Sequence, residues 1–237
     1  MKAILSLLAV GLFLTLTGAV SAADGKAATR ILILGDSTVC DYPANSPNRG
    51  WGQYLQGYFK DNVKVLNHAK SGRSSKSFIT EGLWDKALAE KPDFVLIQFG
   101  HNDSHAKTEP KATDAATDFK DYLRKYVADI RQQGGVPVFV TPMQRRTFTA
   151  DGKLADILLP YANAMKEVAK EKQVGLVDLH TSSGQLYLKL GEAGSKELAN
   201  NAEDRTHFGE KGAKAMAELV MKELPTAEPR LKPLLKD

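Results

Sequence analysis

The sequence predicts an α/β protein of three layers, in which helices cover both faces of a five-stranded parallel sheet. Five short runs of apolar, largely β-branched residues alternate with segments in which apolar residues recur every three or four positions. Continuous apolar runs are typical of parallel strands buried on both faces, and the three-to-four spacing is typical of helices. Five strands that alternate with helices therefore indicate the three-layer α/β/α class.

The predicted strands are short, and a glycine or a polar residue follows each of them. They are residues 31–34, 63–66, 94–99, 136–140 and 174–179. Connections between parallel strands are right-handed, and ligands of such sheets bind at the carboxyl ends of the strands. We therefore expect the chemistry of this protein at that end of the sheet.

The predicted helices are the segments with three-to-four apolar spacing. They are residues 51–58, 119–130, 158–168 and 213–220. Residues 142–153 are polar and contain an Asp151-Gly152 turn, which predicts a surface loop or hairpin. The chain after Leu224 contains three prolines, and we expect it to be irregular.

The first 22 residues have the pattern of an export signal. Lys2 precedes an uncharged apolar run over residues 3–20, and small residues end at Ala22. A membrane anchor is the alternative, because the run is close to the minimum length that spans a bilayer. No charged stop-transfer flank follows, which favours cleavage after Ala22. We expect a secreted or periplasmic protein with one domain over residues 23–237.

Composition excludes several classes of protein. Of the 237 residues, 43% are hydrophobic and 25% are charged, which is ordinary for a globular chain and excludes disordered and collagenous proteins. The formal net charge of +4 does not require nucleic acid as a partner. Cys40 is the single cysteine, so a disulfide scaffold and a Cys-rich metal site are excluded. We expect a monomer that binds no membrane once its signal is removed.

Polar residues gather where strands end. Residues 35–38, 67–75 and 100–103 follow the first three strands, and residues 204–208 precede the last helix. Each cluster has a structural explanation when it is taken alone. Ser37 or Asn102 can cap a helix, and Gly72 can serve only its turn. Because the fold brings three of the four clusters to one edge of the sheet, we interpret them together.

Together these residues meet the requirements of acyl transfer by a serine. Ser37 is the predicted nucleophile, His207 the base that accepts its proton, and Asp204 the carboxylate that orients the imidazole. The oxyanion of the tetrahedral intermediate needs fixed hydrogen-bond donors. The backbone amides of Ser37 and Gly72 and the side-chain amide of Asn102 are the predicted donors, and glycine at 72 lets the backbone approach the substrate.

These clusters resemble the four blocks of the SGNH, or GDSL, hydrolase superfamily. The blocks are residues 35–37 (Gly-Asp-Ser), Gly72, residues 100–103 (Gly-His-Asn-Asp), and Asp204 with His207. The resemblance spans nearly the whole mature chain. It implies a flavodoxin-like fold, the same roles for Ser37, Asp204 and His207, and an oxyanion hole formed by Ser37, Gly72 and Asn102.

One position departs from the family signature, because Thr38 stands where leucine is usual. Residues 35–38 (Gly-Asp-Ser-Thr), 50–52 (Gly-Trp-Gly), 71–75 and 98–103 look similar to the rhamnogalacturonan acetylesterase branch. That resemblance implies removal of O-acetyl groups from a pectic polysaccharide. Thr38 therefore indicates a branch of the superfamily and does not argue against membership.

Three further residues are candidates for substrate binding. Arg145 and Arg146 follow the fourth strand on the same edge, and arginine forks pair well with the uronic acids of a pectic backbone. A solvated pair of arginines is the alternative. Trp51 is a candidate sugar platform, although its place on the apolar face of its helix also fits the core.

The predicted site needs no cofactor. His101, Asp103 and His105 crowd one loop and raise the possibility of a metal, but two of them belong to the block that presents Asn102. We therefore expect no metal. The role of Asp36 stays open between shaping the nucleophile turn and acting electrostatically on the reaction.

The sequence leaves three functions to compare. The first is an exported esterase that removes O-acetyl groups from a polysaccharide such as acetylated pectin. The second is a lipid or thioester acylhydrolase of the same superfamily, which needs an apolar groove that no loop here provides. The third is a non-catalytic flavodoxin-like binding protein, which has no need of the Ser, Asp and His set.

Overall fold

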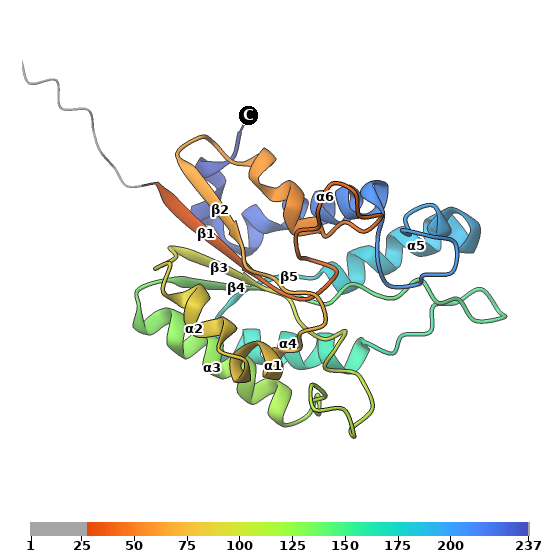
Figure 1. The fold of residues 1–237 in the computed structure, drawn as a ribbon, viewed down its shortest axis with the longest axis horizontal. Helices are drawn as coiled ribbons and strands as arrows, with labels where there is room; N and C mark the ends of the chain where they lie inside the picture. The colour runs from red at the N-terminus through yellow and green to blue at the C-terminus, as the bar shows by residue number, and fades with distance from the viewer. Residues whose placement is uncertain (1–27, 237) are drawn as a thin grey trace, which may run out of the picture.

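The computed structural model describes residues 28–236, so the predicted signal peptide and its cleavage after Ala22 lie outside the described residues. The strands form one sheet with the order β2-β1-β3-β4-β5, and every neighbouring pair is parallel (Figure 1). They are β1 (Thr29–Leu34), β2 (Val63–Asn67), β3 (Phe94–Ile97), β4 (Val136–Val140) and β5 (Gly175–Val177). The predicted α/β class with a five-stranded parallel sheet is confirmed.

Alternate residues of β1 face two separate hydrophobic clusters, as the two-residue repeat of a strand requires. Ile31 and Ile33 belong to one cluster, and Leu32 and Leu34 belong to the other. Both sets are fully buried. The sheet is therefore covered on both faces, which explains why its strands are continuous apolar runs.

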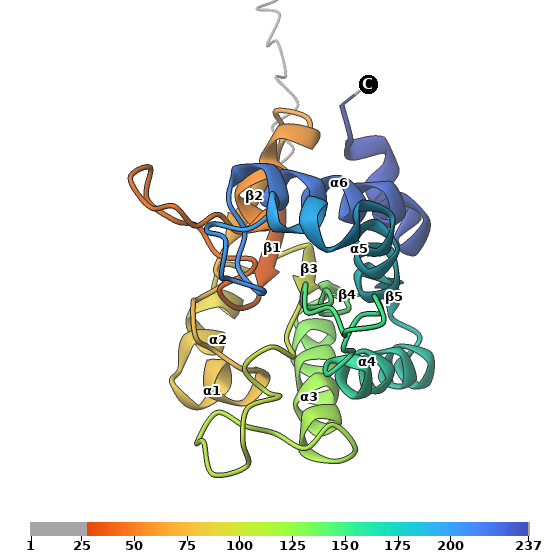
Figure 2. The same ribbon diagram turned by 90° about the vertical axis from the view of Figure 1, so that its right-hand side faces the viewer.

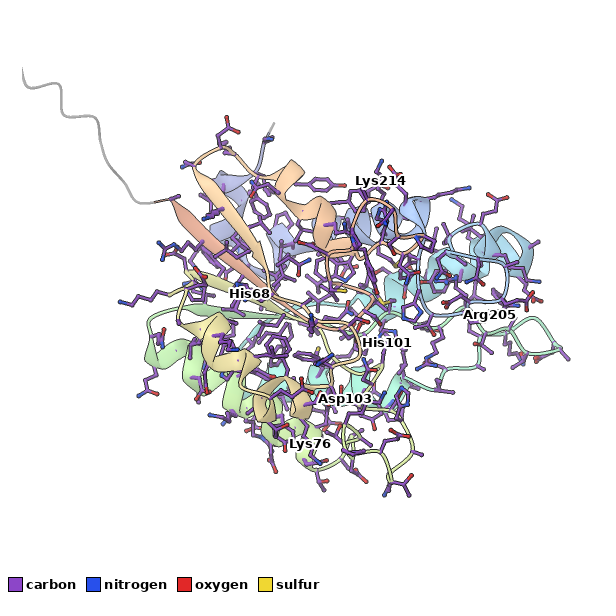
Figure 3. All side chains as sticks on the ribbon, in the orientation of Figure 1. His68, Lys76, His101, Asp103, Arg205 and Lys214 are labelled. Atoms are coloured by element: carbon purple, nitrogen blue, oxygen red, sulfur yellow. The ribbon has the colours of Figure 1, made fainter. Side chains whose placement is uncertain are left out.

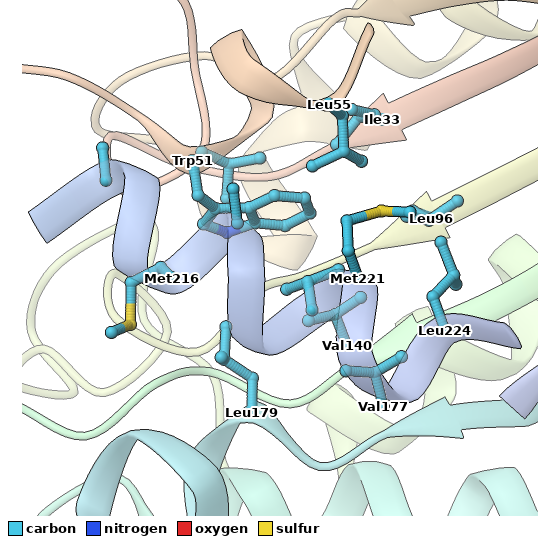
Figure 4. Packing of buried hydrophobic residues seen from close by; sticks show 14 of the residues in the cluster. Ile33, Trp51, Leu55, Leu96, Val140, Val177, Leu179, Met216, Met221 and Leu224 are labelled. Carbon is cyan, nitrogen blue, oxygen red and sulfur yellow. The ribbon is translucent and has the colours of Figure 1, made fainter. Parts of the chain in front are cut away.

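The helices divide between these two faces (Figure 2). One face is covered by α1 (Ser75–Thr80), α2 (Leu83–Leu88), α3 (Asp118–Gln132) and α4 (Leu159–Lys172). The other is covered by η1 (Trp51–Tyr58), α5 (Leu179–Lys196), α6 (Glu210–Ala227) and η2 (Pro229–Leu234). Figure 4 shows part of the cluster that contains Ile33. Trp51 and Leu55 of η1 and Met216 and Leu224 of α6 belong to the same cluster.

The strand order places a topological switch point between β1 and β3. The chain runs from β1 to β2 on one side and then to β3, β4 and β5 on the other. Loops that leave the carboxyl ends of strands at such a point diverge and leave a crevice in which ligands bind. Ser37 follows β1 and Asn102 follows β3, so both lie beside this switch point.

The C-terminal segment is more regular than the sequence predicts. α6 continues through Pro225 to Ala227, and η2 follows it. Leu231 of η2 is fully buried, and the backbone of Leu235 forms an antiparallel bridge with Phe59. These contacts order a proline-containing segment whose local sequence does not favour regular structure.

Other boundaries also differ from the prediction. The strand predicted over 94–99 ends at Ile97, and the one predicted over 174–179 ends at Val177. Asp178 accepts a hydrogen bond from the Thr181 amide and so begins α5 at Leu179. Residues 51–58 form a 3₁₀ rather than an α-helix, and α1, α2 and α5 were not predicted. None of the helices within residues 28–236 is long and apolar enough to span a membrane.

Candidate active site

Ser37 lies in a tight turn directly after β1. The amides of Val39 and Cys40 both donate to the Asp36 carbonyl, and Gly35 packs so closely that a Cβ there would lie 2.6 Å from Val39. The Ser37 carbonyl accepts a hydrogen bond of 2.8 Å from the Tyr42 hydroxyl. Ser37 is only 7% exposed, so the turn holds its hydroxyl in one place at the end of the strand.

His207 and Asp204 reach Ser37 from the loop before α6. The His207 Nε2 atom lies 2.9 Å from the Ser37 Oγ atom, and Nδ1 lies 2.9 Å from Asp204 Oδ2. A carboxylate at Nδ1 holds the proton on that nitrogen, which leaves the Nε2 lone pair to accept the serine proton. The three side chains therefore form a continuous hydrogen-bonded chain that ends at the serine hydroxyl.

Asp204 is held in its ionised form by backbone amides. Its Oδ1 atom accepts hydrogen bonds of 2.7 Å from the amides of Thr206 and His207. Partial burial alone would raise its pKa, but these amides and the His207 ring hold the pKa of Asp204 below its ordinary value. The carboxylate thus stays charged and can stabilise an imidazolium at His207.

The loop that carries Gly72 continues the pairing of β1 with β2. The His68 amide donates to the Ile33 carbonyl, and the Lys70 amide donates to the Gly35 carbonyl. Gly72 has φ +80°, a conformation that L side chains rarely adopt, whereas a Cβ there would meet open space. The positive φ is a reason for glycine at this position, and the open space beside it leaves room for a substrate.

Asn102 is anchored on the neighbouring loop by its side chain. Its Nδ2 atom donates a hydrogen bond of 3.0 Å to the Arg73 carbonyl, and the residue is nearly buried. An amide nitrogen carries two hydrogens, so this bond leaves one free for another acceptor. Residues 101–104 form a turn and the next helix begins at Asp118, so the alternative that Asn102 caps a helix is wrong.

The buried carboxylate of Asp36 stabilises the turn that carries Ser37. Asp36 Oδ1 accepts hydrogen bonds from the amide and the hydroxyl of Thr38, and its Oδ2 lies 3.4 Å from His101 Nδ1. Burial alone would raise the pKa of Asp36, but attraction to His101 and the Thr38 bonds hold it below its ordinary value. These contacts make Asp36 a residue that closes the nucleophile turn.

Asp103, which Figure 3 labels near His101, follows Asn102 in the same loop and joins three segments of the chain. It accepts hydrogen bonds from the amide and the hydroxyl of Ser75, from the Gly100 amide and from the Thr113 hydroxyl. Complete burial raises the pKa of Asp103 to about 6, although the bonds from Ser75 and Thr113 oppose the rise. Among residues 28–236, no group of three or more His, Cys, Asp or Glu side chains is arranged to hold a metal ion.

The buried Asp103 carboxyl should make the stability of the protein fall as the pH rises from about 4 to about 6. Across this interval the unfolded chain releases the proton of Asp103 while the folded chain keeps it, which favours unfolding. The loss is on the order of 1–3 kcal/mol and is complete above pH 6. Urea unfolding at several pH values measures it.

Asp103→Asn should weaken this decline with pH, because asparagine does not titrate. Its amide N–H groups would face the donors that now bind the carboxyl, so the variant should be less stable than wild type at every pH. Asp61→Asn removes an exposed carboxyl and controls for the change in net charge. An Asp103→Asn protein that loses as much stability between pH 4 and 6 as the wild type would contradict the assignment.

The structure corrects two of the three predicted substrate-binding residues. Trp51 is fully buried, and its indole N–H donates 2.9 Å to Gln98, so the prediction that it stacks on a sugar is wrong (Figure 4). The apolar face of η1 points into the core, and Trp51 lies on that face. Arg146 is 2% exposed and contacts the loop of Asp204 and His207, so the prediction that it binds substrate is also wrong.

Arg145 differs from its neighbour because it stays half-exposed at the edge of the site. Its Nη2 atom donates a hydrogen bond of 3.3 Å to the His101 carbonyl oxygen. Among the described residues, no carboxylate lies within ion-pair distance of its guanidinium. Burial lowers the pKa of Arg145, and Asp36 and Asp204 oppose this from a distance. A cation without a close partner therefore faces the site from the end of β4.

Sequence reasoning missed Gln98 and Tyr42 as supports of the site. Gln98 is fully buried and donates 2.9 Å to the Thr38 hydroxyl while it accepts from Trp51, which links the nucleophile turn to the core. A polar residue inside an otherwise apolar strand was the signal for Gln98. No local pattern identified Tyr42, whose role depends on a contact with the Ser37 carbonyl.

Comparison with known proteins identifies the family. The model of the GDSL-like lipase/acylhydrolase family matches residues 33–215, which is most of the chain. The chain belongs to the GDSL-like lipase/acylhydrolase family. This GDSL-like hydrolase is therefore a carboxylic ester hydrolase. The matched segment contains Ser37, Gly72, Asn102, Asp204 and His207.

Two curated relatives share more than a third of their residues with this GDSL-like hydrolase. It is 39% identical to rhamnogalacturonan acetylesterase RhgT of Bacillus subtilis (strain 168), with 82% of this chain and 89% of that protein covered. It is 36% identical to the probable rhamnogalacturonan acetylesterase YesY of the same organism, with 82% and 92% covered.

Solved structures share the fold of this GDSL-like hydrolase. Protein YxiM from Bacillus subtilis superimposes with a TM-score of 0.74 at 28% identity, over 84% of this chain and 56% of that longer chain. Axe2, an acetylxylan esterase from Geobacillus stearothermophilus, has a TM-score of 0.64 at 19% identity, over 84% of this chain and 94% of its own. The second likeness concerns the fold alone.

Proposed function

We propose that this GDSL-like hydrolase is an exported serine acetylesterase that removes O-acetyl groups from a polysaccharide, acetylated rhamnogalacturonan in particular. The observation that carries the proposal is the chain of hydrogen bonds from Ser37 through His207 to Asp204, with a bond of 2.9 Å on each side of the imidazole. The names of the two curated relatives support acetyl as the acyl group and rhamnogalacturonan as the polymer. The signal-like pattern of residues 1–22 supports export.

The first half of the reaction transfers the acetyl group to the enzyme. His207 Nε2 accepts the proton of Ser37 as the serine oxygen attacks the acetyl carbonyl carbon, and Asp204 stabilises the imidazolium that forms. The carbonyl oxygen becomes an oxyanion, for which the amides of Ser37 and Gly72 and the free hydrogen of Asn102 Nδ2 are the donors. The tetrahedral intermediate collapses, and His207 returns the proton to the departing sugar hydroxyl.

The second half repeats these steps with water. His207 takes a proton from the water molecule as its oxygen attacks the acetyl-serine carbonyl, and the same donors hold the second oxyanion. Collapse transfers the proton of His207 to the Ser37 oxygen and releases acetic acid, which ionises to acetate in solution. The reaction consumes one water molecule for each ester that is cleaved.

The surroundings of Gly72 favour a polar substrate. A cavity of about 390 Å³ opens beside Gly72 and is lined mainly by charged and hydroxyl side chains. These are Arg73, Ser77, Thr80, Glu81, Glu109 and Lys111. Burial of a long acyl chain among such groups would desolvate charges without compensation, whereas sugar hydroxyls can bind them. This favours the acetylesterase over the lipid or thioester acylhydrolase.

A direct test is acetate release from acetylated pectin, acetylated xylan and acetylated peptidoglycan. We expect the highest kcat/KM on the pectic polymer. A p-nitrophenyl ester series should show kcat/KM that falls as the acyl chain lengthens from acetyl to octanoyl. A rate that rises along this series would support the acylhydrolase instead, and binding of the polymer without any turnover would support the binding protein.

Arg145 gives a further test of the polymer. We propose that its guanidinium, which lacks a close carboxylate partner, binds a uronate of the substrate next to the acetylated sugar. Arg145→Gln should then raise KM for acetylated pectin roughly three- to tenfold, the effect of a half-exposed ion pair. The KM for neutral acetylated xylan and for p-nitrophenyl acetate should stay unchanged.

Lys153→Gln is the matched control, because Lys153 lies on the same loop but is exposed and paired with Asp151. Steady-state kinetics of both variants on the three substrates measure the difference. Equal changes of KM on the acidic and the neutral polymer would show that Arg145 does not recognise a uronate.

A further inference from the structure

Arg146 is a buried arginine that the reaction steps above do not use. It is among the largest fully buried side chains of the described residues, with 2% exposure. A buried guanidinium is costly because it loses its hydration, and the cost is offset only where its donors find acceptors. The partners that Arg146 does find therefore indicate what its charge is used for.

The hydrogen bonds of Arg146 to backbone carbonyls lie on the loop that carries Asp204 and His207, and its side chain also interacts with Tyr187 of α5. Its Nη2 atom donates a hydrogen bond of 2.6 Å to the His207 carbonyl and a longer one of 3.3 Å to the Asp204 carbonyl. Its backbone amide donates 2.8 Å to the Arg205 carbonyl, and its guanidinium carbon lies 4.5 Å from the centre of the Phe208 ring. Arg146 thus contacts four residues of a five-residue segment.

These contacts are directed to backbone carbonyls rather than to a carboxylate. Among the residues 28–236 no ion pair of Arg146 is found, and its Nε and Nη1 atoms have no hydrogen-bond acceptor there. An arginine buried for stability would satisfy more of its five donors. Instead, one charged nitrogen donates to the backbone carbonyls of the two catalytic residues Asp204 and His207.

The loop of His207 has other supports besides Arg146, because Phe208 is fully buried and its backbone forms an isolated antiparallel bridge with Ala199. Residues 197–209, which follow α5, contain turns and isolated bridges but no helix or strand. The Arg49 amide also donates a hydrogen bond of 2.9 Å to the Phe208 carbonyl. Arg49 and Arg146 therefore hold the segment from two directions. The His207 Nε2 to Ser37 Oγ distance of 2.9 Å depends on the position of this segment.

We propose that Arg146 is a positioning residue, which uses its buried guanidinium to fix the Asp204 and His207 backbone so that the imidazole stays within hydrogen-bond reach of Ser37. This inference rests on the proposed function. A displacement of a catalytic group by about 1 Å can lower a rate by about 100-fold, so loss of the two Nη2 hydrogen bonds acts on the chemical step. Substrate binding is not affected, because the side chain offers no surface to the substrate.

The test compares Arg146→Met with wild type in the hydrolysis of p-nitrophenyl acetate. We expect kcat to fall about 10- to 100-fold while KM changes less than twofold. Because methionine removes a poorly satisfied buried charge and keeps much of the volume, the thermal midpoint should stay within a few degrees of wild type. Arg146→Lys should regain part of kcat, because an ammonium can donate to the same carbonyls but lacks the planar guanidinium that lies over the Phe208 ring.

Arg146→Ala adds a rescue measurement that a merely structural role would not predict. Millimolar guanidinium chloride should raise kcat of this variant several-fold by filling the vacated site, and sodium chloride at the same concentration should not. Arg131→Met is the matched control, because one nitrogen of Arg131 also donates to two backbone carbonyls, those of Lys172 and Gln173 at the C-terminal end of α4, away from the active site. It should keep the wild-type kcat.

A kcat of Arg146→Met within twofold of wild type would overturn the proposal. So would a loss of activity that matches the unfolded fraction seen by circular dichroism and that neither lysine nor guanidinium restores. If Arg146→Met does not fold, Arg146→Ala decides, and a wild-type kcat in that variant without added guanidinium overturns the proposal. Failure of the wild type to hydrolyse any ester would instead count against the proposed function.

Discussion

Ser37→Ala is expected to lower kcat for p-nitrophenyl acetate by about 10⁶-fold, because Ser37 is the hydroxyl that hydrogen-bonds to His207 Nε2 and forms the acyl-enzyme. The remaining rate above that of water comes from substrate binding and the oxyanion donors. The Ser37 side chain makes its hydrogen bond with His207, so its removal should leave the thermal midpoint nearly unchanged. Stopped-flow and steady-state assays together measure the loss.

Labelling with a fluorophosphonate identifies the nucleophile directly. Mass spectrometry of the digested wild-type protein should place the adduct on Ser37, and Ser37→Ala should take up none. Ser182→Ala is the control, since its hydroxyl donates to the Asp178 carbonyl in α5 and should not affect the rate. An adduct on another serine, or substantial activity in Ser37→Ala, would contradict the assignment of the nucleophile.

Asn102→Ala is expected to lower kcat by about 10²- to 10³-fold with little change in KM. The free hydrogen of its Nδ2 atom meets the oxygen mainly when that oxygen becomes an oxyanion, so the bond contributes to the transition state and not to binding. The bond to the Arg73 carbonyl is lost as well, which should cost about 1 kcal/mol of stability. Steady-state kinetics and urea unfolding separate the two effects.

Asn102→Asp distinguishes an oxyanion donor from a residue that only supports the loop. Aspartate keeps the size of the side chain but places negative charge where negative charge develops in the reaction. It should therefore be at least as damaging to kcat as alanine, with the fold intact by circular dichroism. Asn163→Asp, on the exposed surface of α4, controls for the added charge. A stable and active Asn102→Asp enzyme would falsify the role proposed for this residue.

The fold was accessible from the sequence because its signals are local. Each strand is a continuous apolar run, and burial on both faces requires this of every strand in a parallel sheet. The long amphipathic helices α3 and α4 repeat their apolar residues along the buried face. The short helices α1 and α2 have six residues each, too few for a period to be recognised, and packing against the sheet stabilises them instead.

The pair of arginines after β4 shows where sequence reasoning stops. Arg145 and Arg146 are adjacent and chemically identical, and both were predicted to bind substrate. In the structure one stays half-exposed at the edge of the site, and the other is buried against the loop of His207. Successive side chains of an extended segment point to opposite sides, and only the packing of α5 and α6 decides which side is the interior.

The sequence by itself determined the class of fold, the clusters of polar residues that follow the first three strands, and the residue types that an ester hydrolase requires. Those features follow from periodicity and from blocks of a few neighbouring residues. Only the tertiary structure decided that Trp51 belongs to the core, that Gly72 is required by its φ, and that Arg146 holds the catalytic loop. Such roles depend on contacts between residues far apart in the chain, as between Ser37 and His207, and no local pattern encodes the distance between them.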